Sequence, residues 1–128
     1  MSPMDRLPLP PLALLALSLT SCQEDPDPII GIWDATLVGD LQFPVQIEGS
    51  MYTLDLEIKA DLKGTYTFHE SYAGYTEDSA YALTVNADAA PDYVLSIPAA
   101  ELTLTCKLSG ATLHCTDPAA GPYNFKKR

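Results

Sequence analysis

The chain has 128 residues, of which 47% are hydrophobic, and it carries 17 acidic against 7 basic side chains, a formal net charge of −10 at pH 7. This length suits a single domain with one modest hydrophobic core. Because so acidic a surface repels nucleic acid and anionic lipid headgroups, we expect no nucleic-acid partner and no direct attachment of the domain surface to acidic membranes.

The beginning of the chain has the pattern of an export signal. Residues 7–19 are an apolar stretch of Leu, Ala, Pro and Ser, too short to span a bilayer but long enough for the core of a signal peptide. The stretch runs into Leu-Thr-Ser-Cys at residues 19–22. This ending resembles the lipobox of bacterial lipoproteins, which implies a lipoprotein signal peptide over residues 1–21 and lipidation of Cys22. The alternative is an ordinary signal peptide with a cysteine placed there by chance.

Residues 22–28 have the composition of a tether. After Cys22 the chain is acidic, contains two prolines and has no apolar side chain, so we expect it to be extended. Attachment to a membrane would come from the acyl chains on the cysteine. Because Gln23, not Asp, follows it, the resemblance to enterobacterial sorting signals implies delivery to the outer membrane of a bacterial cell envelope.

Residues 29–128 alternate apolar and polar side chains in short runs separated by Gly, Pro, Asp or Asn, which is typical of β-strands. We expect roughly eight or nine strands, joined by short turns into an antiparallel meander. Since each strand has one apolar face, an all-β up-and-down barrel, or a flattened barrel or sandwich, is predicted. The expected strands lie near residues 30–38, 43–47, 52–59, 66–68, 81–85, 93–97, 102–109, 112–116 and 123–125.

The hairpin over residues 102–116 predicts its own register. If Gly110 and Ala111 form a two-residue turn, Cys106 lies directly opposite Cys115 on the apolar face. An exported chain favours a disulfide between them. A metal site with His114 is the alternative, but the neighbours on that face are leucines and the histidine alternates to the other side, so we expect no metal.

Glycine stands two residues before an inward aromatic side chain at three expected strand starts. We interpret each glycine as permitting a turn and each aromatic ring as filling one end of the core. The three pairs are Gly31 with Trp33, Gly64 with Tyr66, and Gly121 with Tyr123.

The Gly31-x-Trp33 start, the meander and the basic residues at the end of the last strand together resemble the lipocalin superfamily. The resemblance implies that Trp33 closes one barrel end and that an arginine packs across it, with Arg128 as the matching residue and Lys127 as the other candidate. The hairpin of residues 104–116 is similar to the closing hairpin of bacterial lipocalin-like lipoproteins.

Glu70 is the most informative single polar residue. Counting by twos from Tyr66 and Phe68 places it on the inward face, where a carboxylate among tyrosines could bind a polar group of a ligand. Alternatively, the strand ends or bulges near His69 and Glu70 lies at the solvated rim; the loop-like residues 73–74 favour this alternative.

Two functions are compatible with these features. The first is a binding module that holds a small apolar or amphipathic ligand in the barrel mouth, and the second is a structural or protein-interaction component of the envelope. The large inward side chains favour a filled barrel and a shallow pocket near the rim. No nucleophile motif, phosphate loop or metal spacing is present, so we expect neither an enzyme nor a cofactor. The candidate ligand-binding residues are Glu70, Tyr66, Phe68, Tyr72 and Tyr81.

Overall fold

The computed structural model of the protein describes residues 26–128. The predicted signal peptide, the predicted lipidation site Cys22 and most of the predicted tether lie outside the described residues. Within the part that is described, no helix has the length and apolarity needed to cross a membrane.

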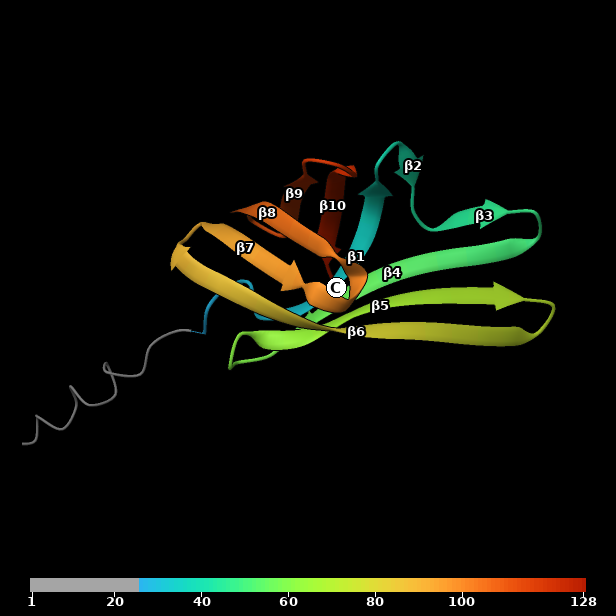
Figure 1. Ribbon diagram of the computed structural model, residues 1–128, viewed down its shortest axis with the longest axis horizontal. Helices are drawn as coiled ribbons and strands as arrows, with labels where there is room; N and C mark the ends of the chain where they lie inside the picture. The colour runs from blue at the N-terminus through green and yellow to red at the C-terminus, as the bar shows by residue number, and fades with distance from the viewer. Residues whose placement is uncertain (1–25) are drawn as a thin grey trace, which may run out of the picture.

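The described chain is an antiparallel meander, as predicted (Figure 1). From β3 to β10 each strand pairs with the next one along the chain, and one short 3-10 helix, η1 (Pro98–Ala100), separates β7 from β8. The strands are β1 (Gly31–Val38), β2 (Leu41–Gln42), β3 (Val45–Ile47), β4 (Ser50–Ile58), β5 (Lys63–Tyr72), β6 (Tyr75–Ala89), β7 (Asp92–Ile97), β8 (Leu102–Ser109), β9 (Thr112–Asp117) and β10 (Gly121–Lys127).

The meander closes on itself because β1 has a partner on each side. Residues 31–34 of β1 pair with residues 55–58 of β4, and β1 also pairs with the last strand, β10. Together β1 and β4 to β10 form a closed eight-stranded barrel, while β2 and β3 are additional short strands. The prediction of an all-β up-and-down barrel is therefore confirmed.

On one side of the barrel, the sheet extends beyond the residues at which β1 and β4 pair. Beyond the residues that pair with β1, β4 pairs with β3, and β5 and β6 run on together to a turn at residues 73–74. Figure 1 shows these strands reaching away from β7 to β10. We call this extension the arm, and it comprises residues 45–53 and 68–80.

β5 and β6 are longer than predicted, and their outer parts form the arm. β5 ends at Tyr72, β6 begins at Tyr75, and their register has no shift along the hairpin. The expectation that the strand ends or bulges near His69 is therefore wrong. Ala73 and Gly74 have φ angles of 49° and 86°, which fit a two-residue turn tight enough for strand pairing to continue up to it.

Trp33 closes one end of the barrel. Its side chain is fully buried, and the indole N–H donates a hydrogen bond of 2.8 Å to the carbonyl oxygen of Ile29. Lys127 lies over the indole ring, with Nζ 5.5 Å from the ring centroid, and donates a hydrogen bond of 3.0 Å to the carbonyl oxygen of Pro28. The segment just before β1 and the end of β10 thus cover the tryptophan together.

Arg128 does not pack across the tryptophan, in contrast to what the lipocalin resemblance implied. Its guanidinium instead donates to both carboxylate oxygens of Asp34 on the outer surface, at 2.7 and 3.1 Å. Successive strand residues point to opposite faces, so the inward position of Lys127 leaves Arg128 outside. Gly31 makes room for this lysine, since a Cβ there would lie 2.7 Å from Lys127 Cε.

The closing hairpin confirms the predicted disulfide. Cys106 on β8 lies directly opposite Cys115 on β9, and the two are bonded in the register predicted around the turn. Both are buried, between Tyr93 on the β7 side and Tyr123 on the β10 side. The disulfide is therefore part of the hydrophobic core, to which all eight barrel strands contribute inward side chains.

Candidate functional site

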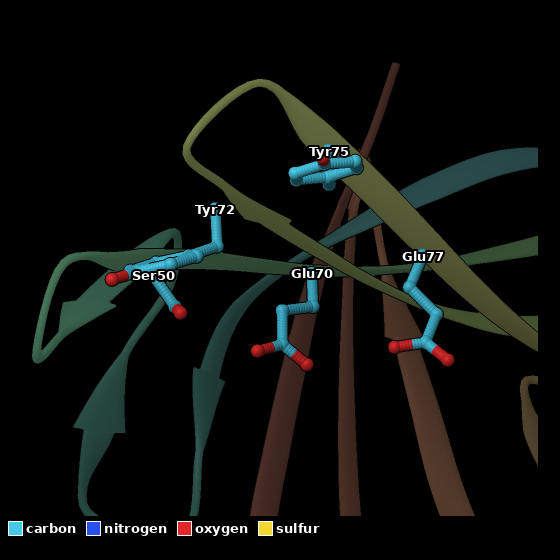
Figure 2. A pocket seen from close by; sticks show the side chains of 5 residues that line it. All are labelled: Ser50, Glu70, Tyr72, Tyr75 and Glu77. Carbon is cyan, nitrogen blue, oxygen red and sulfur yellow. The ribbon is translucent and has the colours of Figure 1, made fainter.

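The arm carries an open pocket on the face that continues the barrel interior. The pocket has a volume of about 310 Å³ and is lined by Ser50, Glu70, Tyr72, Tyr75 and Glu77. Figure 2 shows the side chains of Glu70 and Glu77 extending to the same side of the β5–β6 hairpin. Two carboxylates and two phenol rings therefore line one pocket at the far end of the arm.

Strand register places these side chains together. Glu70 lies directly opposite Glu77, and Tyr72 lies directly opposite Tyr75. Inside the barrel, inward side chains are covered by the strands across from them. The arm has no such cover: Tyr72 is 54% exposed and Tyr75 is 78% exposed. The sheet face that lines the core within the barrel is therefore open to solvent in the arm.

Tyr52 on β4 holds Glu70 in position. Its hydroxyl donates a hydrogen bond of 3.3 Å to Oε2 of Glu70, its direct neighbour across the strands. The Tyr52 ring packs against Phe68 with 5.5 Å between ring centroids. The base of the pocket is thus anchored to the aromatic side chains at the barrel mouth.

The pocket is electrostatically unbalanced. Glu70 and Glu77 face each other across paired strands, an arrangement in which like charges weaken strand pairing. Residues 64–106 contain no Lys or Arg, so the hairpin itself supplies no basic partner. A cation between the two carboxylates would remove the repulsion, and the faces of tyrosine rings attract cations. The arrangement is suited to a positively charged group.

No family model, curated protein or solved structure matches this chain. Among residues 26–128, no group of three or more His, Cys, Asp or Glu side chains is arranged to hold a metal ion. What the pocket can bind is therefore inferred from the geometry and charge of its side chains.

The predicted ligand-binding residues divide into two groups. Glu70 and Tyr72 line the pocket of the arm. Tyr66, Phe68 and Tyr81 lie deeper, where they are half-buried and pack against the core. The structure therefore brings only the outer two of the five side chains to the pocket.

Aromatic side chains pack against one another at the level of the barrel mouth. The rings of Tyr66 and Tyr81 lie 6.1 Å apart, and Leu95 is fully buried. Burial, together with the neighbouring hydroxyl of Tyr123, raises the pKa of Tyr66. Its phenol is therefore neutral at physiological pH. The pocket lies beyond this level, near the rim of the sheet.

Ser50 and Glu77 are pocket residues that sequence reasoning missed. Glu77 belongs to the run Thr-Glu-Asp-Ser at residues 76–79, which has no apolar alternation and so gives no strand signal. The signal that could have found it is the turn at residues 73–74, because a two-residue turn there pairs residue 70 with residue 77.

The outer face of the same sheet carries a charged network centred on His69. Its Nδ1 lies 2.7 Å from a carboxylate oxygen of Asp78, and its Nε2 lies 2.8 Å from one of Asp55. Arg128 approaches Asp55 at 3.7 Å from the other side. Burial lowers the pKa of His69, but the hydrogen bonds and charges of the two aspartates outweigh it, so the net pKa shift is upward.

This network predicts a pH-dependent stability. Since the pKa of His69 is higher in the folded than in the unfolded protein, its contribution is fully present below the unfolded value of about 6.5 and is lost as pH rises through the folded value. We expect the free energy of unfolding, measured by urea titration at a series of pH values, to fall over this window. In the His69→Gln variant the fall should disappear; a step of equal size there would contradict the assignment.

Part of the predicted tether is fixed to the barrel. The Tyr93 hydroxyl donates a hydrogen bond of 2.7 Å to Oδ1 of Asp27, which also accepts one from the backbone N–H of Ile29. Burial and this carboxylate raise the pKa of Tyr93 to about 12. Asp27 thus connects the incoming chain to β7, next to the end that Trp33 closes.

Proposed function

We propose that this protein is a bacterial envelope lipoprotein, lipid-anchored at Cys22, whose lipocalin-like domain binds a small amphipathic ligand with a positively charged group. The lipobox-like ending of residues 19–22 and the buried disulfide support export and anchoring. Mass spectrometry of protein purified from its own membranes tests the anchor. Acyl chains on an N-terminal Cys22 are expected, and an unmodified cysteine would contradict the anchor.

The observation that carries the ligand proposal is the pocket of the arm. Its two facing carboxylates attract a cation, and Tyr72 and Tyr75 offer aromatic faces to the apolar part of the same ligand. The packing of Tyr66 and Tyr81 at the barrel mouth supports binding at the rim. A cationic ligand that enters the pocket would remove the repulsion between Glu70 and Glu77.

Hexyltrimethylammonium is a suitable probe because it joins a permanent cation to a short apolar chain. We expect it to bind the purified full-length protein in isothermal titration calorimetry, while hexanoate, its anionic counterpart, does not. The double variant Glu70→Gln, Glu77→Gln should bind the probe roughly tenfold more weakly, because it loses two partly exposed ion pairs, each of which contributes modestly to the binding free energy.

Glu57→Gln is the control for net charge, and it is compared with Glu77→Gln alone so that each protein loses one carboxylate. Glu57 is an exposed carboxylate on β4 that alternates to the opposite face of the sheet, so its loss changes the net charge without touching the pocket. Binding of hexyltrimethylammonium should be unchanged in this variant. Equal weakening by Glu57→Gln would mean that the probe responds only to overall charge and would remove the pocket from the proposal.

A structural or protein-interaction role is the second candidate. A specific observation favours it: one edge of β6 has no strand partner along the arm, among the residues that the structure describes. An unpaired strand edge can accept a strand from another protein.

A further inference from the structure

The first half of β6 is a strand edge. β6 spans Tyr75–Ala89, and β5 pairs with its residues 75–84. On its other side, β7 pairs with β6 only from Thr84 onward. Among the described residues, no other strand pairs with residues 75–83 on that side. Residues 75–80 are all exposed, so the edge is open where it passes along the arm (Figure 1).

The backbone of this edge carries free hydrogen-bonding groups. The N–H of Val85 points to the β5 side, where it donates to the carbonyl oxygen of Leu62 at 2.9 Å. Backbone direction alternates along a strand, and the register with β5 has no shift, so odd-numbered residues of β6 face β5 throughout. The N–H and C=O groups of Thr76, Asp78 and Ala80 therefore point to the free edge.

The negative charges of Glu77 and Asp78 limit which segments can pair with this edge. Glu77 points to the pocket face and Asp78 to the outer face, where it lies beside His69. A second copy of the same edge would bring carboxylate against carboxylate, which is unfavourable between paired strands. A segment with two adjacent basic residues would instead present one basic side chain to each acid, since neighbouring residues of a strand point to opposite faces.

We propose that the β6 edge binds an extended segment of a partner protein that carries two adjacent basic residues and adds to the sheet as a further strand. Backbone hydrogen bonds to Thr76, Asp78 and Ala80 supply the pairing, and Glu77 and Asp78 select the basic side chains. The interaction shares Glu77 with the pocket, but the strand pairing depends on the unpaired backbone groups of the β6 edge and not on a ligand in the pocket.

The synthetic peptide Thr-Val-Lys-Lys-Val-Thr serves as the probe, with Thr-Val-Glu-Glu-Val-Thr as its charge-reversed control. In amide hydrogen exchange of the full-length protein, we expect Thr76, Asp78 and Ala80 to be unprotected without peptide, whereas Glu77 and Ser79 are already protected by β5. Adding the basic peptide should protect these three amides, and the acidic peptide should leave them unprotected. Protection elsewhere on the barrel would overturn the proposal.

Ala80→Pro tests the edge without removing a bond to β5. Proline lacks the N–H that faces the free edge and is tolerated on edge strands at such positions. We expect it to weaken binding of the basic peptide roughly tenfold, the loss that one missing hydrogen bond produces, while Ala80→Val retains wild-type affinity. Wild-type affinity in Ala80→Pro would overturn the proposal.

Two further measurements distinguish strand addition by a basic segment from self-pairing of the edge and from ligand binding in the pocket. If the three amides become protected at high protein concentration without peptide, the occupant is a second copy and the proposal is wrong. If hexyltrimethylammonium fails to bind but the basic peptide protects the edge, the pocket proposal fails and the strand-addition proposal stands. If hexyltrimethylammonium binds but the basic peptide does not protect the three amides, the pocket proposal stands and the strand-addition proposal is wrong.

Discussion

Replacing Trp33 by alanine is expected to lower the free energy of unfolding by about 4 kcal/mol, the loss typical of a fully buried large aromatic side chain. Trp33 is 0% exposed, and it organises the barrel end through the hydrogen bond to Ile29 and the contact with Lys127. A loss of this size is a large share of the stability of a small domain, about 5–15 kcal/mol. Urea unfolding followed by circular dichroism measures it.

Two further variants provide comparisons for Trp33→Ala, one at the same site and one at an exposed aromatic side chain of the arm. Trp33→Phe keeps much of the ring volume but leaves the buried carbonyl oxygen of Ile29 without its donor, so we expect an intermediate loss of about 2 kcal/mol. Tyr75→Ala removes an aromatic side chain that is 78% exposed and should change stability by less than about 0.5 kcal/mol. A Trp33→Ala protein as stable as Tyr75→Ala would contradict the role of the tryptophan as the closure of the barrel end.

Replacing Gly64 by valine is expected to destabilise the protein by more than about 3 kcal/mol. Gly64 lies opposite Ile58 in the β4–β5 pair. A Cβ at this position would overlap the carbonyl oxygen of Glu57 and lie 3.1 Å from the Cα of Ile58. Both contacts are with backbone, which cannot move aside without breaking the strand pairing. Urea unfolding or the temperature of unfolding measures the effect.

The neighbouring residue offers the control for Gly64. Thr65→Ala is a change of similar size in the same strand that adds no atom near β4, and we expect it to cost less than about 0.5 kcal/mol. If Gly64→Val were as stable as Thr65→Ala, the two strands would have to separate easily at this point. That result would contradict the close approach on which the geometry of the closed barrel depends.

Gly64 also illustrates a limit of the sequence pattern. The spacing of Gly64 and Tyr66 predicts a turn glycine, like Gly31 and Gly121, both of which have positive φ. In the structure Gly64 lies within β5, and what excludes a side chain is the backbone of β4. The sequence marks the position as special, but only the position of the neighbouring strand gives the reason.

The arm shows why part of the candidate site could not be predicted. Glu70 and Tyr72 are predictable because they continue the alternation that starts in the core. Glu77 belongs to a run with no apolar alternation, and Ser50 is a polar residue just before the alternation of β4 begins. Hydrophobic periodicity indicates which side chains are buried. A strand that is stabilised mainly by pairing with its neighbours, and that buries few side chains, therefore shows little periodicity in its sequence.

The sequence by itself determined the strand alternation of the barrel, the register of the closing hairpin and the pairing of Cys106 with Cys115. These are local properties, fixed by side-chain pattern and turn length. The tertiary structure alone decided that Lys127 and not Arg128 covers Trp33, that β4 closes on β1, and that the arm projects beyond the closure. Each of these depends on which distant strands meet and at what register. In a closed barrel, that is set by the packing of all the strands together.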